Sequence, residues 1–207
     1  FSQEIVFLSG MGTNRLDLDV IFDSIWENLE LGSKKRSHPF HLCTISTISK
    51  STKDTPDARI VVLREANKEK FTLRSNADLR TNKCNDIEEN PNTHLLFYDK
   101  EAKIQVRIRA ESEIIKDISL IKDIWLESQE VSQRCYFVPL APSTEIAQPF
   151  NNTMLELDNE NLGSNVFCLI STKVKEIDWL ELDYNGHKRC KFILNDKGLS
   201  KSVWLVP

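Results

Sequence analysis

Residues 58–66, ARIVVLREA, open the part of the sequence that decides the fold. They are rich in β-branched residues, as strands are, and similar short segments recur along the chain. These segments are HLCTISTIS at 41–49, KFTLRS at 70–75, HLLFYD at 94–99, KIQVRIRAESEII at 103–115, NVFCLISTKVKEIDWLEL at 165–182, HKRCKFILN at 187–195 and SVWLV at 202–206. The succession predicts a mainly β fold, an antiparallel barrel of six to eight strands with peripheral α-helices.

Helices are predicted around this strand pattern. In residues 18–30, LDVIFDSIWENLE, apolar side chains recur at near-helical spacing, and Gly32 follows as a stop. Residues 118–129, ISLIKDIWLESQ, predict a second helix, and the polar residues 76–90 a third that Pro91 bounds. One domain over residues 1–207 accommodates all of these elements.

Two connections have distinctive compositions. The segment from Pro139 to Gly163 is rich in proline and asparagine and predicts a long loop. The Asn185-Gly186 pair predicts the turn of a β-hairpin. No domain linker or internal repeat is visible, so residues 1–37 are an N-terminal segment with an amphipathic helix rather than a separate domain.

Glycine is scarce, and this restricts how a phosphate could be bound. Only 6 of the 207 residues are glycine, and neither G-x-G-x-x-G nor G-x-x-x-x-G-K-[ST] occurs. Rossmann and P-loop binding are therefore excluded, and a phosphorylated ligand would need cationic and hydroxyl side chains. Lys+Arg 27 against Asp+Glu 31 gives a formal charge of −4, which disfavours polyanion binding.

Cysteine and histidine spacing predicts neither a disulfide framework nor a metal site. The five cysteines are far apart without a C-x-x-C pair, and the four histidines form no H-E-x-x-H arrangement. No apolar run approaches the length of a membrane span, and residues 1–10 lack the basic start of a signal peptide. These features predict a cytoplasmic protein.

Arg59 is the first candidate for binding chemistry. Alternation along its strand puts Ile60 and Val62 on one face and Arg59 on the other, with Val61 and Leu63. Arg59 therefore shares a face with apolar side chains. It either begins the strand and extends into solvent, which is the more common case, or it meets an anion.

A set of hydroxyl and cationic side chains follows. Its members are Arg64, Ser75, Arg80, Thr81 and Lys83. Arg80 and Lys83 are three residues apart, so on a helix they would project from one side near its N-terminus, where backbone N–H groups favour an anion. Spacing alone favours an ordinary solvated face.

The C-terminal half adds four more candidates. Gln105 lies on the polar face of its strand, which is either half-exposed or offers an amide to a planar heterocycle. Trp179, His187 and Arg189 come from the two halves of the Asn-Gly hairpin. By itself, Trp179 is typical of a core and His187 of a surface.

The order of these fragments resembles the pyridoxamine 5′-phosphate oxidase family of FMN-binding split barrels. The fragments that carry the resemblance are ARIVVLR, Ser75-Asn76, Lys83, IEENP at 87–91, LLFYD, IQVRIRAE, EIDW at 176–179, HKR at 187–189 and the C-terminal WLVP. It covers roughly residues 38–207. It implies a six-stranded Greek-key split barrel that forms a homodimer, with FMN at the subunit interface.

By position, the resemblance implies an FMN site made of side chains. Arg59 and Lys83 would hold the phosphate, Ser75 would add a hydroxyl, and Gln105 would approach the ring from the other subunit. Arg80 is added to the phosphate-binding residues because the loop that contains it is two residues longer than in the vitamin B6 oxidases, which have Arg where this chain has Asn82. The implied cofactor-binding set is Arg59, Ile60, Val61, Val62, Ser75, Arg80, Thr81, Lys83, Gln105, Trp179 and Arg189.

The substrate positions depart from the vitamin B6 oxidase pattern. Where that pattern has Lys, Tyr, Arg and Arg-x-His, this chain has Arg64, Trp125, Gln129, and Asn185 with His187. Lost cations at two positions disfavour pyridoxamine phosphate and indicate an oxidase-related branch. Arg64 and His187 stay as candidate substrate contacts.

Three functions remain open from the sequence. The leading hypothesis is an FMN-dependent oxidoreductase that acts on a small molecule, in which the flavin supplies the redox chemistry. A flavin carrier or sensor without turnover is the second. A dimerising barrel that uses its basic cleft for another ligand is the third.

Overall fold

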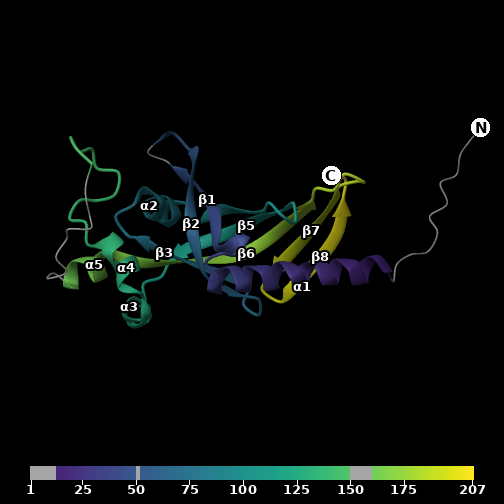
Figure 1. Ribbon diagram of the computed structural model, residues 1–207, viewed down its shortest axis with the longest axis horizontal. Helices are drawn as coiled ribbons and strands as arrows, with labels where there is room; N and C mark the ends of the chain where they lie inside the picture. The colour runs from purple at the N-terminus through teal and green to yellow at the C-terminus, as the bar shows by residue number, and fades with distance from the viewer. Residues whose placement is uncertain (1–12, 50–51, 150–159) are drawn as a thin grey trace, which may run out of the picture.

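The computed structural model describes residues 13–49, 52–149 and 160–207 (Figure 1). Most of this chain lies in one antiparallel sheet. Its strands are β1 Leu42–Ser49, β2 Thr55–Asn67, β3 Thr72–Asp78, β4 Asn92–Asp99, β5 Ile104–Ile114, β6 Phe167–Glu181, β7 Lys188–Asn195 and β8 Gly198–Leu205. The helices are α1 Thr13–Lys34, α2 Asn82–Glu89, α3 Ile118–Glu127, α4 Glu130–Gln133 and α5 Glu160–Val166, with short 3-10 turns η1 Pro39–His41 and η3 Arg134–Tyr136. Residues 1–10, for which the sequence predicts no signal peptide, lie outside the described part.

The sheet order shows how the strands are joined. They run β3-β2-β1-β4-β5-β6-β7-β8, and β3 also pairs with β6, so six strands form a closed ring of hydrogen-bonded neighbours. The prediction of a mainly β antiparallel fold with peripheral helices is confirmed. The prediction of a six-stranded Greek-key split barrel is not confirmed, because the sheet of the described residues has two strands beyond the six that close the ring.

The length of β6 explains the two additional strands. β6 is 15 residues long, and β3 pairs only with its first half, from Phe167 to Lys173. The second half, Glu176–Glu181, would leave its backbone groups unpaired on that edge, and β7 takes this place. β8 then extends from β7.

Helix α1 packs against the sheet, and its apolar side chains form the main core together with side chains from the strands. Its side chains Phe22, Ile25, Trp26 and Leu29 are buried, as the helical spacing predicts. The helix nevertheless continues past Gly32, which is not a stop. A Cβ atom at this position would lie 2.7 Å from the carbonyl carbon of Phe40, so glycine allows the close approach of helix and chain.

Other predicted boundaries also shift. Asn76 and Asp78 belong to β3, so the predicted helix over 76–90 is reduced to α2. The predicted loop from Pro139 to Gly163 ends in α5, although its residues 150–159 lie outside the described part. The Asn185-Gly186 turn does join β6 to β7, with Gly186 at φ +136°.

The helices divide the molecule into two ends. Figure 1 shows α3, α4 and α5 gathered at one end of the sheet, while β7 and β8 form the other. α2 lies near the first end, where it contacts β1 and β5. Residues from β1, β2, β3 and the start of β6 therefore approach the same helix, and this is where several candidate residues lie.

Candidate functional site

Helix α2 is the element around which the predicted phosphate-binding residues gather. Thr81 precedes it in an extended conformation, and the helix buries Cys84, Asp86 and Ile87. The Thr81 hydroxyl donates to the carbonyl of Asp78, 2.7 Å away, and makes no capping bond to the helix. The first-turn N–H groups are thus uncapped by a side chain, which leaves donors for an anion.

Arg59 approaches this helix through Thr47. The Arg59 guanidinium donates to the Thr47 hydroxyl at 2.7 Å, and Thr47 donates to the Asp86 carboxylate at 2.8 Å. Arg59 also pairs with Asp57 and lies 4.0 Å from Asp86. The sequence prediction that Arg59 shares the apolar face is confirmed, since Val61 and Leu63 on that face are buried. Arg59 keeps 23% of its side chain exposed, enough to reach a ligand.

Lys83 lies at the same helix start, whereas Ser75 lies on the preceding strand β3. The Lys83 ammonium donates to the Thr81 hydroxyl at 3.1 Å, and within the described chain it makes no ion pair. Ser75 is buried on β3, opposite Leu63 of β2. The fold therefore brings Lys83 and Thr81 together and links Arg59 to α2 through Thr47, while Ser75 lies on β3, the strand that precedes this helix.

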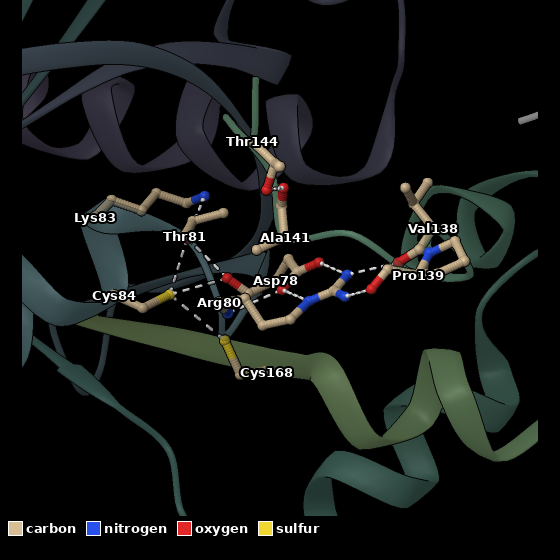
Figure 2. A network of polar contacts seen from close by, with 10 residues as sticks. All are labelled: Asp78, Arg80, Thr81, Lys83, Cys84, Val138, Pro139, Ala141, Thr144 and Cys168. Atoms are coloured by element: carbon tan, nitrogen blue, oxygen red, sulfur yellow. Dashed lines mark hydrogen bonds and ion pairs between the residues drawn. The ribbon is translucent and has the colours of Figure 1, made fainter. Parts of the chain in front are cut away.

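Arg80 is engaged differently. It binds Asp78 through two bonds, Nε to Oδ1 at 3.0 Å and Nη2 to Oδ2 at 2.7 Å. Its guanidinium also donates to the carbonyls of Val138 and Pro139 (Figure 2). These contacts join the turn before α2 to the chain after η3, and they occupy the donors with which Arg80 would bind a phosphate.

A second set of candidates lies on the outer face of the sheet. Gln105, Leu180 and Arg189 are cross-strand neighbours on β5, β6 and β7. Arg189 donates to the buried carboxylate of Asp178 from Nε at 3.1 Å and from Nη2 at 2.8 Å. Arg107 donates to the same carboxylate at 2.6 Å.

The electrostatics of this outer face follow from the arginines. Burial raises the pKa of Asp178, but the hydrogen bonds from Arg189 and Arg107 outweigh it and lower the pKa overall. His94 lies on the neighbouring strand, opposite Arg109. Its pKa is lowered, first by burial and then by Arg107 and Arg109. His94 is thus held in its neutral form.

The remaining candidates for cofactor binding, Ile60, Val61, Val62 and Trp179, divide between the two faces of the sheet. Ile60 is 68% exposed and Val62 is half-buried on the outer face, whereas Val61 points into the core. Trp179 is also in the core, opposite Val106 and Cys190. It therefore lies on the face opposite to Arg189, and one chain does not bring the two side chains together.

The two predicted substrate contacts are far apart along the sheet. Arg64 is exposed on β2. Burial raises the pKa of the Tyr136 phenol, and the nearby charge of Arg64 offsets only part of this increase. His187 is exposed in the connection before β7. Trp125, at a predicted substrate position, is buried against Phe137 and Phe167 instead.

Sequence reasoning missed the acidic partners of this site. Asp78, Asp86 and Asp178 are buried, and each is bonded to an arginine or to a residue that binds one. Asp178 is the neighbour of Trp179 in EIDW, so strand alternation puts its side chain on the face that points away from the core. Its two arginine partners come from β5 and β7, which no local pattern reveals.

Two further properties concern the described residues. They contain no group of three or more histidine, cysteine, aspartate or glutamate side chains placed to hold a metal ion. They also contain no helix with the length and hydropathy needed to cross a membrane. The predicted cytoplasmic location stays a prediction.

Comparison with known proteins shows what the chain is similar to. Residues 23–116 match the family described as pyridoxamine 5′-phosphate oxidase, FMN-binding domain. The resemblance to this family is confirmed, and the chain is pyridoxamine 5′-phosphate oxidase-like.

Individual relatives support the same class. The chain is 27% identical to a pyridoxine/pyridoxamine 5′-phosphate oxidase of Wolbachia pipientis, over 98% of both chains. It is 22% identical to pyridoxine/pyridoxamine 5′-phosphate oxidase 2 of Arabidopsis thaliana, over 86% of this chain and 93% of the relative.

Solved structures share the fold at low identity. A pyridoxamine 5′-phosphate oxidase-related, FMN-binding protein from Nostoc punctiforme superposes with a TM-score of 0.74 and 18% identity, covering 89% of this chain and 96% of the other. PhzG from Burkholderia lata, solved with tetrahydrophenazine-1-carboxylic acid, gives a TM-score of 0.68 at 11% identity, covering 91% and 92%.

The ion pairs of Asp178 with Arg107 and Arg189 make the free energy of unfolding depend on pH. Because the folded-state pKa of Asp178 is lowered, its stabilising contribution is complete above the unfolded-state pKa of about 3.9 and is lost as the pH falls through the folded-state value. We expect Asp178→Asn to lower the free energy of unfolding by about 1–3 kcal/mol at neutral pH, because a charge-assisted pair is removed. The deficit should shrink below about pH 4, where the wild-type carboxylate also protonates.

Urea denaturation of both proteins at neutral and acidic pH measures this difference. Glu113→Gln is the matched control, because it neutralises an exposed carboxylate on β5, and we expect a change within about 0.5 kcal/mol. A deficit for Asp178→Asn that is equally large at both pH values would contradict the assignment.

Proposed function

We propose that the protein binds FMN and acts as an FMN-dependent oxidoreductase on a small molecule. The observation that carries the proposal is the start of α2, where Lys83 and uncapped backbone donors lie beside Thr81 in a family domain described as FMN-binding. Arg59 of β2 reaches the same helix through Thr47 and Asp86, and Ser75 lies on β3, the strand before it. In this proposal they complete the phosphate site.

The donor set fits a phosphate dianion. Lys83 brings a positive charge whose one bond in the described structure goes to a hydroxyl, so no carboxylate competes for it there. Arg59 brings a second charge that Thr47 and Asp57 hold in place. Charge-assisted bonds to a phosphate are about twice as strong as neutral ones, and a helix start adds a favourable dipole.

Arg80 has a different role in this proposal. Binding a phosphate would require it to leave a bidentate bond to Asp78, whose side chain is only 8% exposed. Removing one partner of such a pair is costly. We therefore assign Arg80 to positioning, since it holds the turn before α2 against the carbonyls of Val138 and Pro139.

A homodimer would complete the site. The outer face exposes Leu42, Ile60, Leu96 and Tyr98 on three adjacent strands. Gln105 lies next to this apolar area, opposite Tyr98. When two copies pack through this face, Gln105 and Arg189 of one copy can approach the α2 start of the other, which one chain does not achieve.

The chemistry that follows divides between cofactor and protein. FMN bound there would supply hydride and electron transfer. The chain itself binds the phosphate at α2, holds Arg189 in place through Asp178, and offers Arg64 and His187 for substrate contacts. Gln129 and Asn185 offer no cation to a second phosphate, which favours an oxidase-related activity over oxidation of pyridoxamine phosphate.

The phosphate site is tested by removing its charges. We expect Lys83→Ala to weaken FMN binding about tenfold, and Arg59→Ala with Lys83→Ala to weaken it at least about 100-fold, because each lost charged bond is worth about 1.5–3 kcal/mol. Titration of FMN fluorescence measures the dissociation constants. Lys68→Ala with Arg74→Ala removes two cations elsewhere and should leave binding unchanged. A colourless wild type whose melting temperature does not respond to FMN would reject the proposal.

The dimer is tested at the apolar outer face. We expect Ile60→Asp with Leu96→Asp to convert a dimer into monomers in analytical ultracentrifugation, because two buried carboxylates would face apolar surface. Val20→Asp is the matched control, since Val20 is 67% exposed on α1 and Ile60 is 68% exposed. A wild-type protein that stays monomeric at micromolar concentration with FMN present would contradict the dimer.

Turnover separates an oxidoreductase from a carrier or sensor. In one assay the bound flavin is reduced anaerobically, and its reoxidation by candidate acceptors is followed by absorbance. In a second assay the protein with oxidised flavin is mixed with pyridoxamine phosphate, and product formation is followed by absorbance. We expect a small-molecule acceptor to reoxidise the flavin faster than it reoxidises free FMN, and pyridoxamine phosphate to give no product. Reoxidation no faster than for free FMN with every acceptor would favour the carrier. Product from pyridoxamine phosphate would show that Gln129 and Asn185 do not prevent that reaction.

A further inference from the structure

Two cysteines meet beneath the start of α2. Cys84 comes from the first turn of the helix and Cys168 from the start of β6, 84 residues further along the chain. Their sulfur atoms are 3.7 Å apart, and Figure 2 shows the two side chains pointing toward each other. Both are free thiols. A disulfide would bring the two sulfur atoms from this distance to roughly 2.05 Å.

The two thiols have unequal environments. Thr81 places its hydroxyl 3.3 Å from the Cys84 sulfur, and the positive charge of Lys83 is near. The hydrogen bond from Cys168, with Thr81 and Lys83, lowers the pKa of Cys84 despite burial. The same hydrogen bond and burial raise the pKa of Cys168. The Cys84 thiol also donates to the carbonyl of Asp78 at 3.3 Å. Its lowered pKa makes it the more easily deprotonated of the two thiols, as the attacking thiol of such a pair must be.

The remaining buried cysteines provide a contrast. Cys43 and Cys190 lie in the main core, where burial raises the pKa of each to about 12. Cys84 is separated from solvent by one short helix turn, in which Asn82 and Asn85 are exposed. Peroxide would reach the Cys84 sulfur when this turn opens locally.

We propose that Cys84 and Cys168 form a reversible disulfide when the protein meets hydrogen peroxide. The Cys84 sulfur attacks one peroxide oxygen, an S–O bond forms, the O–O bond breaks, and the released hydroxide takes a proton to become water. The Cys168 sulfur then attacks the Cys84 sulfur, the S–O bond breaks, and a second water leaves with the Cys168 proton. Peroxide is reduced by two electrons, and the two thiols are oxidised to one disulfide.

The disulfide would also change the neighbouring anion site. The cross-link pulls the first turn of α2 toward β6, and that turn carries Lys83 next to Thr81. This consequence rests on the proposed function, because it assumes that FMN phosphate binds there. The cross-link itself does not depend on FMN, so the two ideas can fail separately.

The experiment uses the full chain with Cys135→Ser, which removes the exposed cysteine. The reduced protein is treated with hydrogen peroxide, remaining thiols are alkylated, and peptides are mapped by mass spectrometry. We expect a Cys84–Cys168 linked peptide that dithiothreitol releases, with Cys43 and Cys190 alkylated. Cys168→Ser should stop at a sulfenic acid on Cys84 that dimedone traps, and Cys84→Ser should leave Cys168 reduced.

The outcomes decide between the alternatives. Oxidised Cys84 with Cys168 still alkylated, or equal reaction of Cys43 and Cys190, would overturn the proposal. FMN titration of reduced and cross-linked protein then tests the coupling, for which we expect at least a tenfold weaker affinity after cross-linking. Equal affinities would overturn the coupling. A cross-link in a protein that never binds FMN would support the dithiol site and overturn the proposed function.

Discussion

Pairing along β6 is the constraint on which the rest of the structure depends. This strand meets β5 along one edge, while its other edge is shared between β3 and β7. Because backbone donors and acceptors must be satisfied, the shared edge both closes the ring of six strands and starts the extension to β8. The start of β6 lies beneath α2, and its end lies beside Gln105. One strand therefore links the two sets of candidate residues.

Buried carboxylates set the second constraint. Asp78, Asp86 and Asp178 would be costly without partners, and each lies within a network that contains an arginine. These networks hold Arg80, Arg59 and Arg189 in single orientations. Of these three, Arg59 and Arg189 are proposed binding residues, and holding them in place before a ligand arrives would reduce the entropy lost on binding.

The two proposals and the Arg80 network meet around one short helix. α2 carries Lys83, the proposed phosphate ligand, and Cys84, whose sulfur lies 3.7 Å from that of Cys168. The turn before α2 is joined to the chain after η3 through Arg80. A change at the thiols therefore reaches the anion site without a long pathway. If both proposals hold, this closeness would couple the redox state of the two thiols to cofactor binding.

Strand periodicity predicted a good part of the fold and some of the site. Val61 is buried and Ile60 exposed as alternation requires, because a strand places successive side chains on opposite faces. The helix stop at Gly32 was wrong, since the reason for that glycine is the backbone of Phe40, which is remote from the helix pattern. The Asp78 partner of Arg80 is only two residues away, but whether they bond depends on the turn between β3 and α2.

The sequence by itself determined the class of fold, the family resemblance and the absence of a glycine-rich phosphate loop, because these depend on local composition and order. Only the tertiary structure decided which charges are already paired, that Trp179 and Arg189 face opposite sides of β6 and β7, and that Cys84 meets Cys168. The physical reason is that cross-strand register and helix packing join residues far apart in the chain. Local patterns predict which face a side chain occupies, but not what it meets there.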